Sequence, residues 1–470
     1  MGFLKFCLVI LFVFSISGSF AQFPENEFNS YLKIAYENNP GLKASFNQYL
    51  SALEKVPHVG SLPDPQLTFG YFLSPMELIG GNQVADIQVM QMFPWFGTLK
   101  ISRDEATMMA KSKYEAFNIS KAELFYNIKS QWYELMKFDR EIELVRENIK
   151  MMESLEKLII IKFQSPVSDV SSSEMNTQNQ GNSDEMNQPA DAMGGMNNQT
   201  NLSKNMEPEN GSSGSMSNSG SGLKDVFRVR MEILEQKNKL ELLSDRRQLT
   251  EANFNALLNR NIETPVQISD SLIKQPLPID RSTFSDSISN NNYMLEMLAN
   301  ESRAYILMEQ KTKKMRMPML GLGLNYMLID ERKGNTFMMN GKDMVMPMIS
   351  ISIPLYQKKY TSMQTDARLM NESANLQIAD LKNNLMVQSF KFIQELDDAE
   401  RRIELYKELE NLARTTTNLL ISELANSGNN YEEILRMQLT ILDYGFRRIE
   451  AIVDYNTVIA DVEKYLGKIY

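Results

Sequence analysis

Two long stretches of the chain, 98–165 and 355–427, contain neither proline nor glycine. Apolar residues recur every seven positions at Leu135, Ile142, Ile149, Leu435, Leu442 and Ile449. A seven-residue period predicts α-helices packed as coiled coils. Each stretch is about 70 residues long and would reach on the order of 100 Å as a helix. An ordinary coiled-coil scaffold fits this part of the pattern equally well.

Between the helical stretches the apolar period changes to two. Leu320, Leu322 and Leu324 alternate with Gly321 and Gly323, and isoleucines alternate with serines near residue 350. One apolar face and one small or polar face are typical of membrane β-strands. We therefore predict strands at about 65–73, 86–94, 318–329 and 344–354.

Four such strands cannot form a complete membrane structure. Lipid offers no hydrogen-bond partner to an open sheet edge, and single-chain barrels start at about eight strands. The sequence therefore predicts that several copies assemble to close one barrel. The connections at 74–85 and 330–342 are polar enough to face water.

The helix and strand pattern occurs twice. A constant offset of 253 pairs Asn38 with Asn291 and Pro65 with Pro318, which predicts a first repeat at 22–270 and a second at 271–470. The offset grows to 260 at the pair Pro94 and Pro354 and falls to 208 further on, so 52 residues are present only in the first repeat. We place this insertion at about 168–220, where aromatic residues are absent and the composition cannot form a core.

Composition limits the chemistry that the chain can perform. Residues 1–21 resemble a signal peptide that ends at Ala21, and Cys7 within it is the only cysteine. His58 is the only histidine, which excludes Ser-His-Asp triads and histidine-based metal sites. The net charge of -10 argues against nucleic acid. No Gly-rich phosphate loop is present. We expect neither an enzyme nor a bound cofactor.

Short motifs in this order resemble the TolC family of outer-membrane efflux proteins over essentially the whole mature chain. The motifs are Asn38-Asn39-Pro40, Leu62-Pro63-Asp64-Pro65-Gln66-Leu67, Gln91-Met92-Phe93-Pro94-Trp95-Phe96-Gly97 and Ser352-Ile353-Pro354-Leu355-Tyr356. The Pro-Asp-Pro and Phe-Pro-Trp-Phe-Gly forms are most similar to the heavy-metal branch, which serves resistance-nodulation-division pumps.

The resemblance implies a homotrimer in the cell outer membrane. Twelve strands would form one barrel in the lipid, and the helices would continue it as an α-helical tunnel through the periplasm. A periplasmic adaptor (membrane fusion) protein and an inner-membrane efflux pump would dock at the helical tips, which this mapping places near 165–225 and 426–433. The cargo would be heavy-metal cations such as Cu(I) or Ag(I).

Charged residues at the mapped tips are the candidate gate. Asp225 and Glu433 begin the returning helices, where an acid complements the helix dipole, and Arg228 and Arg436 follow three residues later. They form either an inter-chain latch or ordinary caps with solvated partners. The family's glycine-containing tip turn is present at Gly428, whereas the insertion replaces it in the first repeat.

The 32 methionines suggest a soft-metal site, because thioethers suit Cu(I) and Ag(I). Methionines at heptad positions, such as Met152, are explained by packing. Packing does not explain those in the polar insertion, namely Met175, Met186, Met193, Met196, Met206 and Met216. Capture of a soft metal, incidental low complexity and contact with the adaptor are the three readings of these residues. Two rows share one face at strand spacing, which fits either packing or a row along a pore: Met315, Met317 and Met319, and Met344, Met346 and Met348.

Two other functions remain open at this point. A multidrug or organic-solute channel would have the same architecture, because selectivity in such systems lies largely in the pump. A soluble periplasmic coiled-coil protein could instead bind metal through the insertion. The alternating strands argue against that reading, since a soluble scaffold has no use for rows of lipid-facing Leu and Ile.

Overall fold

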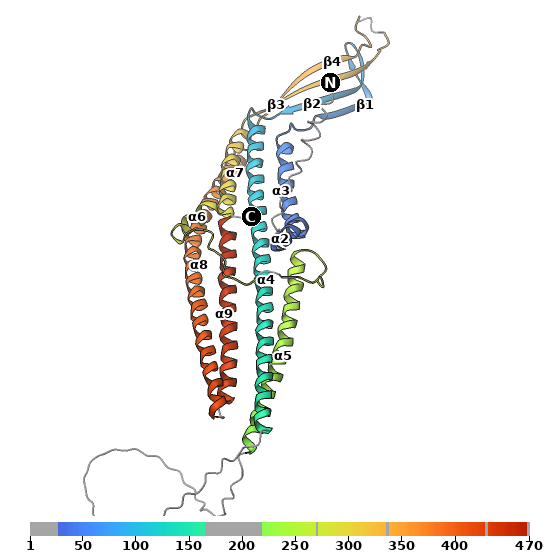
Figure 1. Cartoon of the computed structure of the whole chain (residues 1–470). Helices are drawn as coiled ribbons and strands as arrows, with labels where there is room; N and C mark the ends of the chain where they lie inside the picture. The colour runs from blue at the N-terminus through green and yellow to red at the C-terminus, as the bar shows by residue number, and fades with distance from the viewer. Residues whose placement is uncertain (1–26, 165–218, 269–270, 335–337, 428–430, 468–470) are drawn as a thin grey trace, which may run out of the picture.

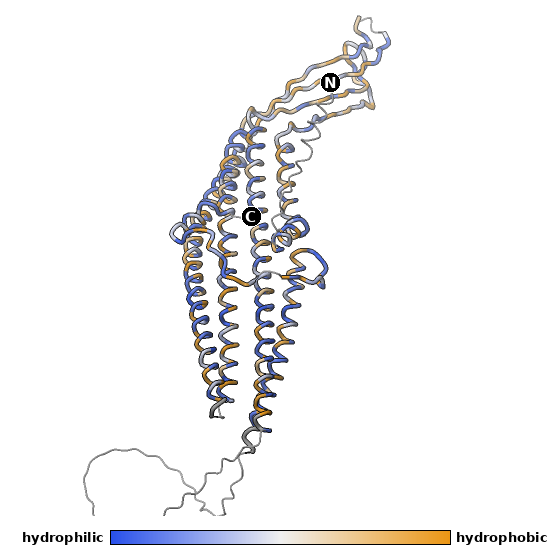
Figure 2. The backbone as a smooth tube through the Cα atoms, viewed as in Figure 1, coloured by the Kyte–Doolittle hydropathy of each residue, from blue (hydrophilic) through white to orange (hydrophobic). Residues whose placement is uncertain are grey.

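The computed structural model describes residues 27–164, 219–268, 271–334, 338–427 and 431–467. The described chain is elongated, with a four-stranded sheet at one end and a helical body extending from it (Figure 1). Hydrophobic and hydrophilic residues alternate along the long helices (Figure 2), as expected for helices that bury one side. Among these residues no helix is long and apolar enough to cross a membrane.

The helices are α2 (Glu27–Asn38), α3 (Pro40–Val59), α4 (Thr98–Gln164), α5 (Ser219–Leu257), the 3₁₀ turn η1 (Arg281–Thr283), α6 (Phe284–Asn291), α7 (Tyr293–Met315), α8 (Gln357–Ser427) and α9 (Tyr431–Leu466). Helix α4 packs against α3, α5, α7 and α9, and α8 packs against α7 and α9. The predicted fold class, mainly α-helix with a small antiparallel sheet, is confirmed.

The two longest helices begin shortly after a proline that ends a strand segment. Pro94 precedes α4, with Gly97 in the left-handed region at a φ of 85°, and Pro354 precedes α8. Proline has no N–H for the strand ladder, and glycine tolerates the sharp change of direction. Since neither residue type recurs within α4 or α8, each helix continues without a break.

Two asparagines link the helices next to the sheet, α3 and α7, to the ends of α5 and α9. Asn39 caps α3 by accepting a hydrogen bond from the Leu42 N–H at 3.0 Å, and its amide donates to the Leu257 carbonyl at the end of α5 at 2.9 Å. Asn292 caps α7 in the same way, and its amide donates to the Tyr465 carbonyl near the end of α9 at 3.3 Å. Each asparagine thus starts one helix and satisfies a terminal carbonyl of another.

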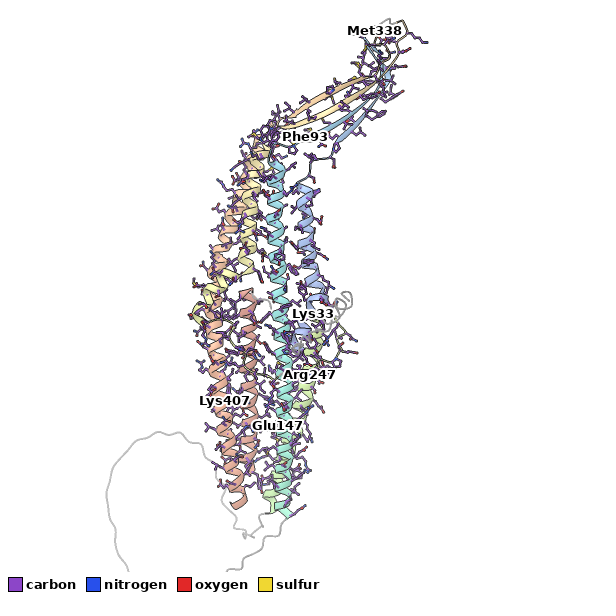
Figure 3. All side chains as sticks on the ribbon, turned by 45° about the horizontal axis from the view of Figure 1, so that its top comes forward. Lys33, Phe93, Glu147, Arg247, Met338 and Lys407 are labelled. Atoms are coloured by element: carbon purple, nitrogen blue, oxygen red, sulfur yellow. The ribbon has the colours of Figure 1, made fainter. Side chains whose placement is uncertain are left out.

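The sheet contains β1 (Gln66–Leu78), β2 (Gly81–Phe93), β3 (Met319–Asp330) and β4 (Met344–Ser352). Its order is β1-β2-β3-β4, and all neighbours are antiparallel. Phe93 lies where the sheet meets the helical body, and Met338 lies near its far end (Figure 3). Because β1 and β4 stand at the two ends of this strand order, they are the edges of the sheet within the described chain.

The first hairpin is longer than the sequence pattern predicts. Strand β1 continues to Leu78 and β2 starts at Gly81, so most of the expected polar loop at 74–85 is strand. The pairing register shifts between Tyr71 and Met76, around Pro75. A bulge at this point accommodates the missing proline N–H, and pairing then resumes beyond it. In the second hairpin β4 ends at Ser352, two residues before Pro354.

The two faces of the sheet differ in chemistry. A row across the four strands on one face, which we call the apolar face, consists of Phe69, Ile87, Tyr326 and Val345. The next row, on the opposite or polar face, consists of Thr68, Gln88, Asn325 and Met346. On the apolar face, large side chains such as Leu67, Leu322 and Ile349 are more than half exposed. None of the described residues of the single chain covers this surface.

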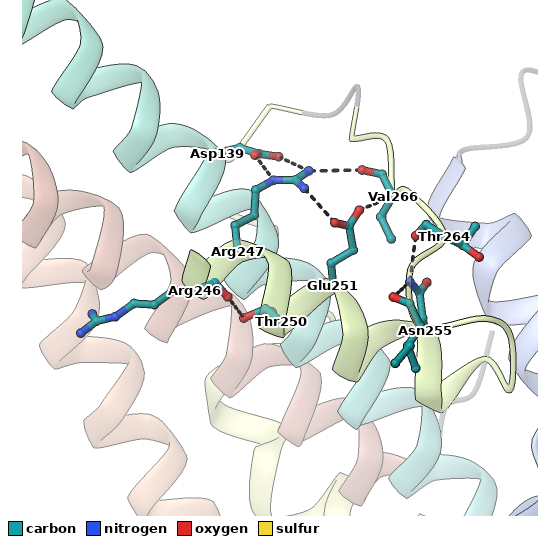
Figure 4. A network of polar contacts seen from close by, with 9 residues as sticks. Asp139, Arg246, Arg247, Thr250, Glu251, Asn255, Thr264 and Val266 are labelled. Carbon is teal, nitrogen blue, oxygen red and sulfur yellow. Dashed lines mark hydrogen bonds and ion pairs between the residues drawn. The ribbon is translucent and has the colours of Figure 1, made fainter. Parts of the chain in front are cut away.

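A segment that we call the strap, residues 258–283 apart from 269–270, crosses the helical body. At its start the buried Asn255 of α5 donates to the carbonyls of Ile262 at 3.0 Å and Thr264 at 2.8 Å. Arg247 donates to the Val266 carbonyl at 3.2 Å and forms an ion pair with Asp139 of α4 (Figure 4). The first part of the strap is thereby fixed to α4 and α5.

The far part of the strap is fixed to α8 and α9. Asn456, which is fully buried, donates to the Ile273 carbonyl at 2.8 Å and accepts from the Gln275 N–H at 2.9 Å. Arg281 pairs with Glu400 at 2.8 Å, and Lys274 pairs with the same carboxylate. The strap therefore links the helix pair α4 and α5 to the helix pair α8 and α9.

We predict that Asn456→Ala loosens the strap. The change removes both hydrogen bonds from Asn456 to the part-buried backbone of Ile273 and Gln275, and each such bond contributes about 0.5–1.5 kcal/mol. Circular dichroism should show a lower midpoint of thermal unfolding, and limited proteolysis should cut the segment near 271–280 faster. Gln377→Ala is the control, because this exposed amide bonds only to Ser373 one turn away. Equal effects of the two substitutions would contradict the assignment.

Candidate functional site at the helix ends

The helix ends farthest from the sheet share an apolar cluster. This tip cluster contains residues of α4, α5, α8 and α9, namely Met152, Leu155, Ile159, Val226, Val229, Ile233, Leu420, Leu424, Tyr431, Ile434 and Leu435. Ile434 is only 2 % exposed at its centre. Side chains from two helix pairs are therefore packed into one core near the end that the sequence maps as the gate.

Charged residues predicted for the gate surround this cluster. Arg228 of α5 forms an ion pair with Glu432 of α9 at 2.7 Å, which connects the two helix pairs. Glu433 and Arg436 lie 3.5 Å apart within α9. Burial raises the pKa of the Tyr431 hydroxyl, and the Asp225 carboxylate adds to this shift. The structure thus brings Asp225, Arg228 and the start of α9 together.

Sequence reasoning missed Glu432 as the partner of Arg228. Alignment of the two repeats selected Glu433, yet both acids lie in the first turn of α9. No periodicity in the sequence separates the two acids, because the pairing of Glu432 with Arg228 depends on how α5 and α9 pack. Gly428 and the six methionines of the insertion lie outside the described residues, and their predicted roles stay predictions.

Additional polar contacts bind α4 to its neighbours above the tip. Arg230 of α5 donates to Glu156 of α4 at 2.7 and 2.9 Å. The buried amide of Asn148 in α4 donates to the Gln438 carbonyl of α9 at 3.2 Å. The first contact lies within the α4/α5 pair and the second joins α4 to α9, so together they fix the register of α4 against both neighbours.

A buried acid and a lysine lie near the middle of the body. Burial raises the pKa of the Glu141 carboxyl and lowers the pKa of the Lys239 ammonium, while their opposite charges act against both shifts. The Lys239 Nζ also lies 4.0 Å from the centre of the Phe446 ring on α9. These groups sit between α4, α5 and α9.

A hard-metal centre needs several ligating side chains close together. In the described part of the chain, no group of three or more His, Cys, Asp or Glu side chains is arranged to hold a metal ion. The charged groups at the helix ends are paired with one another on an exposed surface. This arrangement suits a mechanical contact between helices.

Comparison with known proteins agrees on the fold. No protein-family model and no curated protein matches the chain. The Vibrio cholerae outer membrane protein VceC matches with a TM-score of 0.65 and 11% identity, over 94% of this chain and 96% of that chain. The open-state MtrE outer membrane channel of Neisseria gonorrhoeae gives 0.65 and 11%, over 94% and 88%.

CusC, whose crystal structures concern transmembrane channel formation, matches with a TM-score of 0.60 and 10% identity, over 94% of this chain and 92% of that chain. At identities this low, the likeness concerns the fold alone. The chain therefore has the fold of outer-membrane channel proteins.

We predict that the tip depends on its apolar cluster more than on its ion pair. Ile434→Ala should destabilise it by about 2–5 kcal/mol, because it removes a buried branched side chain. Arg228→Ala should cost only about 0.2–1 kcal/mol, because both partners are at least half exposed. Hydrogen exchange should accelerate in 222–235 and 431–442 for the first variant and change little for the second. A larger effect of Arg228→Ala would refute this ranking.

Proposed function

We propose that the chain is one subunit of a TolC-type outer-membrane efflux channel. It acts as a homotrimer in which three four-stranded sheets close a twelve-stranded barrel and the helices form a periplasmic tunnel. The observation that carries this proposal is a sheet with two unpaired edges and an exposed apolar face. A soluble protein would cover that face, whereas lipid covers it in a membrane barrel.

The sheet edges support closure by further copies. Strands β1 and β4 each pair on one side only within the described chain. In lipid an unpaired backbone group costs several kcal/mol, so an open edge is not viable there. Pairing of β4 with β1 of the next copy satisfies both edges.

The helical body offers matching surfaces for the same neighbours. Leu405, Leu412 and Leu419 follow one another at heptad spacing on α8, and Leu412 is 64% exposed. On α5, Leu242 and Leu249 are exposed at the same spacing. Apolar heptad stripes bury themselves against other helices. The proposed partner of these stripes is a second copy of the chain, because the same copy pairs with this one at the sheet edge.

The proposed cargo is a heavy-metal cation such as Cu(I) or Ag(I), delivered by an inner-membrane pump through a periplasmic adaptor that docks at the tips. The channel performs no catalysis. Its methionine content and the heavy-metal form of its sequence motifs support this cargo. Within the same proposal, Met175, Met186, Met193, Met196, Met206 and Met216 collect the soft cation near the tunnel entrance. Export of drugs or organic solutes is the alternative cargo for the same architecture.

We predict that Leu412→Lys weakens the trimer. The lysine would place a charge in the apolar contact between copies, at a position where the isolated chain tolerates it. Native mass spectrometry of the detergent-extracted protein should show monomer in place of trimer. Ile262→Lys introduces the same side chain at an exposed position in the strap and should leave the trimer intact. Recovery of the wild-type protein as a soluble periplasmic monomer would overturn the channel proposal.

We also predict that deletion of residues 168–220 lowers tolerance of copper and silver in cells that depend on this channel. The deletion removes six thioether ligands and no residue of the tip cluster. Export of an organic substrate, measured as dye efflux, should stay unchanged in the same cells. Unchanged metal tolerance would remove the role proposed for the insertion and favour the organic-solute alternative.

A further inference from the structure

Methionines gather on the polar face of the sheet. The strand register places on this face Met90, Met92, Met319, Met327, Met344, Met346 and Met348. They come from β2, β3 and β4 and alternate along each strand with residues of the apolar face. The sequence pattern indicated the row on β4, but the contribution of β2 became visible only through the register.

Packing does not account for this choice of residue. On the apolar face the same strands use Leu, Ile, Phe and Val, which fill space at least as well. The methionines instead share their face with Asp86, Gln88 and Asn325, and no described helix covers it. Apolar but polarizable side chains on a polar wall indicate a ligand that prefers sulfur.

Two of the sulfurs converge over a glycine. A Cβ on Gly321 would lie 2.7 Å from Sδ of Met92 and 3.2 Å from Sδ of Met90. At Gly323 a Cβ would lie 3.0 Å from the same Met90 Sδ. The two glycines of β3 therefore leave the space that the two thioethers of β2 occupy. A thioether pair on one side of a strand is the minimal ligand set for a two-coordinate soft cation.

An unsatisfied polar group lies one row further along the same face. Asn325 is 8% exposed, and its Oδ1 has no hydrogen-bond partner among the described residues. Its cross-strand neighbours are Gln88 and Met346, and Asp86 pairs with Met327 in the next row. A buried acceptor and a nearby carboxylate favour a cation at this wall over an anion.

We propose that Met90 and Met92, over Gly321, form a binding site for Cu(I) or Ag(I) on the wall of the duct. The proposal rests on the proposed channel function, in which the polar face lines the lumen. Thioethers are neutral and need no deprotonation, so binding is independent of pH near neutrality, unlike binding by cysteine or histidine. Neutral ligands on several successive rows let the ion bind and leave again, as conduction requires.

The test is methionine oxidation footprinting of the full chain with Ag(I). The purified channel is treated with hydrogen peroxide in chloride-free nitrate buffer, with and without silver nitrate, and each methionine is followed by mass spectrometry. A metal-bound thioether is protected from oxidation to the sulfoxide. With free Ag(I) at about ten times the Kd, oxidation of Met90 and Met92 should slow about tenfold. Met370 and Met386, exposed on α8, serve as internal controls.

Gly321→Ala is the decisive variant. Its Cβ displaces the flexible ends of Met90 and Met92 without removing a ligand, so protection of both should fall while their oxidation without silver continues. Met370→Leu/Met386→Leu should leave protection at Met90 and Met92 unchanged. Equal rates with and without silver at Met90 and Met92, or equal slowing at the control methionines, would overturn the site.

A parallel measurement separates this inference from the proposed function. Channel conductance in planar bilayers and native mass spectrometry are recorded on the same preparation. Trimeric, conducting protein without silver protection refutes the methionine site and leaves the channel proposal standing. Protection in protein that neither assembles nor conducts supports the site and refutes the channel proposal, because Met90, Met92 and Gly321 belong to one chain.

Discussion

The unpaired edges of the four-stranded sheet are the constraint on which the rest of the structure depends. In the proposed membrane barrel, the N–H and C=O groups along the free sides of β1 and β4 need partners, because lipid provides none. One chain is then incomplete by itself, and the proposed neighbouring copies supply the complementary edges. If copies join at these sheet edges, their helices also come to lie side by side. The exposed leucine stripes on α8 and α5 are consistent with contacts between the helices of such neighbouring copies.

The helical body extends far from the sheet although four of its helices, α3, α5, α7 and α9, are much shorter than α4 and α8. Asn39 and Asn292 start α3 and α7 and bond to the ends of α5 and α9, so that short helices follow one another beside the continuous α4 and α8. These two asparagines are separated by the offset of 253 found in the sequence. The equivalent bonding supports the proposed duplication and gives the Asn-Asn-Pro motif a physical role.

Local patterns made much of this architecture predictable. The absence of Pro and Gly indicated α4 and α8, and the two-residue period indicated β3 and β4. The extension of β1 beyond Pro75 was missed because it depends on cross-strand pairing after a bulge. Glu432 was missed as the partner of Arg228 for a similar reason, since the pair joins helices that are distant in sequence. The strap contacts of Asn456 also arise only from tertiary packing.

The two faces of the sheet explain why some methionines carry information and others do not. At Met152 a thioether fills a core between helices, and leucine would serve equally well. In the proposed barrel the apolar face contacts lipid, which requires only hydrophobic side chains. The polar face neither fills a core between helices nor contacts lipid in the proposed barrel. Its residues can therefore be selected for the proposed cargo. Under the proposed channel function, Met90 and Met92, placed over glycines that leave them room, therefore support a soft cation as the cargo.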